Sequence, residues 1–104
     1  MSSILILTTA SSYQEANVIA RQLLKARLAA CVTISAPAES YFWWDKKIER
    51  AKERVLLIKT KKKLYKKIEK AILMCHSYEV PEIISLPIQK GSTKYLNWLC
   101  SVTA

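Results

Sequence analysis

The spacing of hydrophobic residues in the first quarter of the chain predicts a strand followed by a helix. Residues 4–7 form a short apolar run of strand-favouring residues. In residues 16–24 the apolar positions recur at i, i+3, i+4, i+7 and i+8, which places them on one face of a helix. Ser11 and Ser12 are each followed three residues later by an amide or an acid, so either can cap that helix. We expect the helix to end near Arg27.

Residues 30–60 show the pattern of one long β-hairpin. The hairpin opens with the β-branched run ACVTIS, and Pro37 then fits only an edge strand or a bulge. An aromatic run follows at 41–44, and a second apolar run at 55–60 returns. The polar segment 45–54 between them is predicted to be the hairpin tip, flanked by an exposed strand.

The last part of the chain predicts a second helix, a strand and a short terminal helix. The second helix covers 64–75, with apolar residues on one face and lysines on the other. Segment 76–88 is extended, because each of its two prolines restricts the residue before it, and it supplies a strand. A short helix capped by Ser92 or Thr93 follows the only glycine of the chain.

The resulting order, β-α-β-β-α-β plus a terminal helix, is that of a ferredoxin-like α+β domain. We expect residues 1–104 to form a single domain with a four-stranded antiparallel sheet and two helices on one of its faces. The hairpin would then expose Phe42, Trp43 and Trp44, and Trp98 lies on the apolar side of the last helix. A patch of this kind on a monomer usually marks an interface, so these four residues are predicted to contact other copies of the chain.

Composition narrows the compartment and the class of protein. The chain of 104 residues is 51% hydrophobic, and we find no signal segment and no apolar stretch long enough to cross a membrane. Cys31, Cys75 and Cys100 are odd in number and lack a CxxC spacing. This usage fits buried thiols in a reducing compartment, and we expect the protein in the cytoplasm.

The net charge of +9 is unevenly distributed, since 12 of the 17 basic residues lie in residues 46–70. A lysine-rich helix with Tyr65 could grip phosphates, and Trp43 and Trp44 could stack on bases. The alternative is a solvated helix face that keeps the protein soluble. Six acidic residues are interleaved in or beside the same region and weaken its field, so we favour the solvated face and expect no nucleic-acid partner.

The candidate chemistry is confined to the segment C-H-x-x-E-x-x-E, which contains Cys75, His76, Glu79 and Glu82. These residue types can bind copper or zinc, and Cys75, His76 and Glu82 are the predicted metal ligands. The alternative is a packed cysteine, a histidine that favours a helix C-terminus, and solvated acids. His76 is the only histidine, no phosphate-binding loop is present, and no base is placed to activate a thiol, so we expect no enzymatic activity.

Several stretches together resemble the CutA divalent-cation tolerance proteins. They are IARQLLKARLAACVTI, SYFWWDKKIE, VLLIKT, HSYEVPEIISLPI and GSTKYLNWL, and they cover most of the chain. The resemblance implies a ferredoxin-like fold, a tight trimer with long hairpins extending sheets across subunits, and an architecture similar to the PII signalling proteins. It also implies tolerance of divalent metals, copper especially, with no reaction attached.

The match to the family's H-P-Y-x-x-P-E segment is close but not complete. The residues that fit, with the proline that follows the segment, are His76, Tyr78, Pro81, Glu82 and Pro87. Ser77 replaces the usual proline. Some family members are thought to bind copper through a cysteine at the end of the first strand, where this chain has Thr8 or Thr9, and through adjacent histidines, where it has Cys75 before His76.

The hairpin also departs from the family, whose pattern S-x-Y-x-W-x-G-K-I has a glycine where this chain has Lys46 and a tyrosine where it has Phe42. If that turn needs a positive φ, lysine would cost about 1 kcal/mol there.

The sequence thus predicts a self-associating, non-enzymatic protein that needs no metal to fold, and the resemblance implies that it is a homotrimer of copper or other divalent-cation tolerance. The alternative is a trimeric scaffold that binds a small molecule or a protein partner at its subunit clefts.

Overall fold

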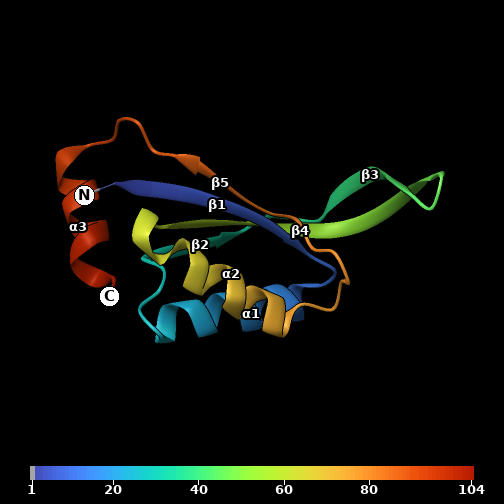
Figure 1. The fold of residues 1–104 in the computed structure, drawn as a ribbon, viewed down its shortest axis with the longest axis horizontal. Helices are drawn as coiled ribbons and strands as arrows, with labels where there is room; N and C mark the ends of the chain where they lie inside the picture. The colour runs from blue at the N-terminus through green and yellow to red at the C-terminus, as the bar shows by residue number, and fades with distance from the viewer. Residues whose placement is uncertain (1) are drawn as a thin grey trace.

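The computed structural model describes residues 2–104 as one α+β unit with principal extents of 44 × 26 × 24 Å (Figure 1). Its elements, in chain order, are β1 (Ser3–Ala10), α1 (Tyr13–Lys25), β2 (Cys31–Ile34), β3 (Ala38–Trp44), β4 (Lys47–Lys61), a 3-10 turn (Lys62–Leu64), α2 (Tyr65–Cys75), β5 (Ile83–Pro87) and α3 (Thr93–Val102).

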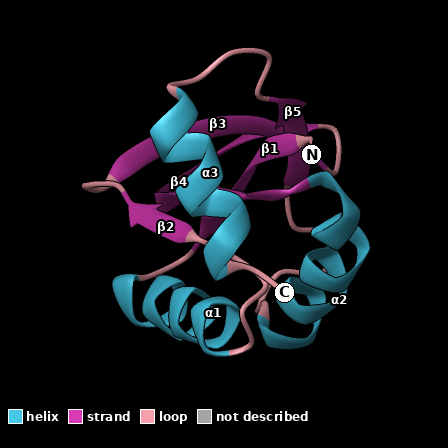
Figure 2. Ribbon diagram, turned by 90° about the vertical axis from the view of Figure 1, so that its left-hand side faces the viewer, coloured by secondary structure: helices cyan, strands magenta, loops and turns pink. Residues whose placement is uncertain are grey.

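The strands form an antiparallel sheet in the order β2-β4-β1-β5, and β3 pairs with the first half of β4. Helices α1 and α2 cover one face, whereas α3 crosses the end of the sheet (Figure 2). The predicted ferredoxin-like α+β fold is confirmed. The expectation of four strands was wrong, because the strand before the hairpin turn is broken at Pro37 into β2 and β3.

The core lies between the sheet and α1 with α2. Alternate residues of β1 and β4 point into it, and Ile6 and Ile58, which are register partners, are both fully buried. Ile19 of α1 and Ile68 of α2 pack against them in the same buried cluster. Burying an isoleucine side chain stabilises the fold by roughly 1.5–3 kcal/mol, so this cluster holds the helices to the sheet.

Helix α1 begins and ends with local signals. The Ser12 Oγ accepts a hydrogen bond from the Glu15 backbone N–H at 3.1 Å, which makes Ser12 the cap and not Ser11. The helix ends at Lys25, two residues before the predicted end at Arg27. Arg27 has a φ of 60°, and this left-handed residue turns the chain toward β2.

A hairpin arm, made of β3 and residues 47–53 of β4, projects from the sheet (Figure 1). Its turn consists of Asp45 and Lys46, whose φ angles are 51° and 64°. Two consecutive positive φ values are the signature of a two-residue type I′ turn. The predicted tip over 45–54 was therefore too long, since β4 begins at Lys47. The suspected positive φ at Lys46 is confirmed.

The C-terminal helix is tied to the rest of the chain by polar contacts. Ser92 caps it, since its Oγ accepts a hydrogen bond from the Tyr95 backbone N–H at 3.2 Å. The ammonium group of Lys61 donates to the Thr103 carbonyl at 3.3 Å. In the described part of the chain, no helix has the length and apolar character needed to cross a bilayer.

Candidate functional site

A cleft of about 910 Å³ lies between the hairpin arm and the loop that follows α2. We call it the arm cleft. The side chains that characterise it are aromatic or acidic: Tyr41, Phe42, Trp44, Tyr78, Glu49, Glu53, Glu79 and Glu82 line it, with Arg50 as the one basic residue among its lining. The cleft is thus locally acidic in a chain of net charge +9.

The inner wall of the arm cleft is fixed by a contact between the loop and β4. The Tyr78 hydroxyl donates a hydrogen bond to the Glu53 carboxylate at 2.7 Å. Glu53 is only 7% exposed. Burial, with the hydrogen bond to Glu53 and its charge, raises the pKa of Tyr78 above the usual range of tyrosine. Tyr78 therefore stays a neutral donor at physiological pH.

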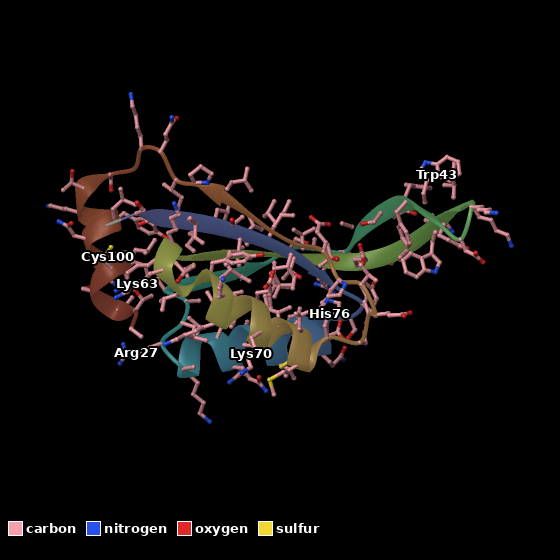
Figure 3. The ribbon with its side chains drawn as sticks, viewed as in Figure 1. Arg27, Trp43, Lys63, Lys70, His76 and Cys100 are labelled. Carbon is pink, nitrogen blue, oxygen red and sulfur yellow. The ribbon has the colours of Figure 1, made fainter. Side chains whose placement is uncertain are left out.

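The side chain of His76 is buried behind this wall, and both of its ring nitrogens make contacts. Its Nε2 contacts the Thr9 carbonyl oxygen, and its Nδ1 lies 3.0 Å from the Tyr78 backbone N–H. Since a carbonyl can only accept and a backbone N–H can only donate, Nε2 carries the proton and Nδ1 accepts. His76 thereby joins the end of β1 to the loop after α2 (Figure 3).

Glu15 holds the same loop from the side of α1. Its carboxylate accepts hydrogen bonds from the backbone N–H of Ser11 and of Ser77, each at 3.0 Å. Burial alone would raise the pKa of Glu15. The hydrogen bonds from Ser77 and Ser11 and the neighbouring His76, 4.0 Å away, outweigh it and lower the pKa. Glu15 thus acts as an ionised clamp on the start of the loop.

The three predicted metal ligands do not come together within one chain. The Cys75 thiol points to α1 and donates to Gln22 Oε1 at 2.9 Å, while Glu82 lines the arm cleft. Both nitrogens of His76 are engaged in the contacts described above. Within residues 2–104 no three His, Cys, Asp or Glu side chains are grouped closely enough to hold a metal ion. A resident metal does not fit these residues as a single chain arranges them.

The four predicted interface residues lie at two ends of the molecule. Phe42 and Trp44 line the arm cleft, and Trp43, which is 72% exposed, projects from the arm (Figure 3). Trp98 belongs to α3 at the opposite end, where it stacks at a tilt on Tyr95 with 5.5 Å between ring centroids. Their predicted contacts with other copies of the chain stay a prediction, because the structure contains a single chain.

Sequence reasoning did not anticipate the parts played by Glu53 and Glu15. One signal for Glu53 was present, because Ala51, Glu53 and Val55 share one face of a strand, and Val55 is apolar. An acidic residue on the same strand face as a buried apolar residue is expected to need a hydrogen-bond partner. The partner, Tyr78, lies 25 residues further along the chain, and nothing local in the sequence links the two.

Comparisons with known proteins decide the family. The CutA1 divalent ion tolerance protein family matches residues 4–102 of this chain. The chain belongs to this family. The divalent-cation tolerance protein CutA of Archaeoglobus fulgidus is 40% identical over 94 residues, which are 90% of this chain and 91% of that protein. The chloroplastic rice protein CutA 1 is 37% identical over 97% of this chain, which spans 57% of the rice protein.

Solved CutA structures share the fold throughout. CutA1 from Oryza sativa superposes with a TM-score of 0.97 at 36% identity, over 100% of this chain and 95% of the rice chain. The divalent cation tolerance protein from Thermus thermophilus gives 0.96 at 36% identity, over 98% and 99% of the two chains. The CutA family is named for tolerance of divalent ions, and its name refers to no catalysed reaction.

Proposed function

We propose that this protein acts in divalent-cation tolerance, copper included, as a homotrimer that binds or responds to metal without catalysing a reaction. Membership of the CutA1 family supports the link to divalent cations. The observation that carries self-association is the exposed apolar surface of the hairpin arm. We also propose a cytoplasmic location, which the three free cysteines favour.

The hairpin arm exposes several large apolar side chains, and their contact with water is unfavourable in an isolated chain. Tyr41, Phe42, Trp43, Trp44 and Ile48 are between 40% and 72% exposed. At about 25 cal/mol per Å² of apolar area, covering a patch of this kind stabilises an assembly by several kcal/mol. A second copy of the chain is the proposed cover.

Sedimentation velocity at micromolar concentration tests this assembly. The wild type is expected to sediment as a trimer, and Trp43→Ser is expected to shift it toward smaller species. Met74→Ser is the matched control, because Met74 is 78% exposed but lies on α2, away from the arm. A wild type that sediments as a single chain would contradict the proposal.

The metal ligands are proposed for the assembled protein, with His76, Cys75 and Glu82 as the candidates. Metal binding by His76 requires it to release the Thr9 carbonyl or the Tyr78 N–H. Calorimetric titration with Cu(II) and Zn(II), comparing wild type with His76→Ala, Cys75→Ala and Glu82→Gln, separates the ligands. A reduced stoichiometry in a variant supports that ligand, and an unchanged stoichiometry in all three removes the set.

A second candidate function, a trimeric scaffold that binds a small molecule or protein partner, is favoured by the arm cleft. Its 910 Å³ and its aromatic lining suit an organic ligand. Native mass spectrometry of protein purified without chelator or metal-affinity resin distinguishes the two. Bound metal supports the first function, and an apo trimer with a copurified organic molecule supports the second.

A further inference from the structure

A second cleft, of about 1080 Å³, lies at the opposite end of the molecule from the hairpin arm. We call it the lysine cleft. The start of β1, the start of α2 and the segment after β5 surround it, and Leu96 of α3 contributes to its wall. Four lysines line it, namely Lys61, Lys62, Lys63 and Lys66, and no acidic residue is among its lining. In Figure 3, Lys63 lies at the end that carries α3.

Lys61 is the buried member of this set. It is 4% exposed, and the single hydrogen bond of its side chain within the described chain goes to the neutral carbonyl of Thr103 at 3.3 Å. No carboxylate of residues 2–104 lies within 4.0 Å of its ammonium group. Burying an ammonium ion costs several kcal/mol unless an opposite charge compensates it. Lys61 also lines the lysine cleft, so an anion bound there would add negative charge near this buried cation.

The start of α2 adds positive charge to the same cleft. The N-terminal end of a helix carries a partial positive charge and favours acidic side chains. Here the first turn of α2 contains no acid and the helix has no side-chain cap, and Lys62 and Lys63 lie in the 3-10 turn that precedes it. Lys66 lies in its first turn. Three exposed lysines and the helix end thus bring charge of the same sign to one side of the cleft.

We propose that the lysine cleft binds a small anion that carries two or more phosphate groups. Lysine ammonium groups act as point charges toward phosphate oxygens. A single phosphate, with a charge of about −2 at neutral pH, does not match four lysines. The cleft is also far larger than one phosphate needs, and the hydroxyls of Ser3 and Ser85 line it as further hydrogen-bond donors. This site is separate from the arm cleft and from the proposed metal ligands.

The experiment is calorimetric titration of the full-length assembled protein with tripolyphosphate at about 50 mM salt, where screening is modest. We expect one site per chain. The double variant Lys62→Ala/Lys66→Ala is expected to weaken binding at least about tenfold, since each charge-assisted contact is stronger than a neutral one. The matched control, Lys46→Ala/Lys47→Ala, removes the same charge from the hairpin arm and is expected to change the affinity less than about twofold.

Three outcomes would overturn the proposal. One is the absence of tripolyphosphate binding by the wild type. Another is an equal loss of tripolyphosphate affinity in both double variants, because the loss would then follow from the change in net charge. The third is binding of a single-stranded 20-mer of deoxythymidylate that is stronger than that of tripolyphosphate and weakened equally by both pairs, which would indicate a general polyanion surface. The exposure of all four substituted lysines keeps the variants foldable.

Discussion

Tyr78 and Glu53 form a 2.7 Å hydrogen bond that joins the loop after α2 to the base of the hairpin arm. Removing the hydroxyl in Tyr78→Phe leaves a buried carboxylate without its donor, and we expect a loss of about 2 kcal/mol in the free energy of unfolding. Urea unfolding at equal chain concentration measures it. Tyr13→Phe is the control, because Tyr13 is 49% exposed and lies on α1 outside the hairpin arm, so this variant is expected to unfold like the wild type.

The same pair predicts a loss of stability in alkali. The pKa of Tyr78 is raised by burial and by the Glu53 carboxylate. A raised pKa stabilises the fold below the unfolded value of about 10, and that contribution disappears as pH rises toward the folded value. The stability difference between wild type and Tyr78→Phe should therefore shrink from pH 8 to pH 11. A stability difference that stays constant over this range would show that folding does not raise the pKa of Tyr78.

Glu15 makes the opposite prediction in acid. Burial raises its pKa, but the hydrogen bonds from Ser77 and Ser11 and the nearby His76 lower it on balance. A lowered pKa stabilises the fold above the unfolded value of about 4.3, and the contribution is lost as pH falls through the folded value. Glu15→Gln should cost about 1–2 kcal/mol at pH 7 and much less near pH 3. Glu79→Gln, at an exposed position, is the control for the loss of one carboxylate.

Thr8 and Thr60 give a matched pair in the core. Both are fully buried, but the Thr60 hydroxyl donates to the Leu28 carbonyl, whereas the Thr8 hydroxyl has no partner within residues 2–104. Burying a polar group without a hydrogen bond costs about 1–3 kcal/mol, so Thr8→Val, which removes such a group, should stabilise the protein. Thr60→Val breaks a hydrogen bond and should destabilise it by about 1 kcal/mol. Equal shifts of the unfolding midpoint in both variants would contradict this interpretation.

Lys46 occupies a left-handed position in the hairpin turn, with a φ of 64°. Glycine adopts this conformation without the steric penalty of a Cβ, so Lys46→Gly should stabilise the protein by up to about 1 kcal/mol. Thermal unfolding at fixed chain concentration measures the change. Lys47→Gly, at the first position of β4, should instead destabilise, because glycine weakens a strand. A Lys46→Gly variant less stable than the wild type would show that the turn changes conformation.

The sequence by itself determined the helices and their order with the strands along the chain. The apolar spacing of residues 16–24 and the serine before it placed α1, and Ser92 marked the start of α3. These signals are local, since helix periodicity and caps involve residues three or four apart. Pro37 was recognised as a site for an edge strand or a bulge, but the division of this strand into β2 and β3 was not predicted.

Only the tertiary structure decided which polar side chains meet. His76 and Thr9 are 67 residues apart, and Tyr78 and Glu53 are 25 apart, so no local pattern records either contact. The sequence grouped Cys75 with His76 because they are neighbours, but the end of α2 turns the cysteine toward Gln22 and the histidine toward β1. Such contacts depend on how the strands and helices pack, because long-range packing fixes the direction in which each side chain points.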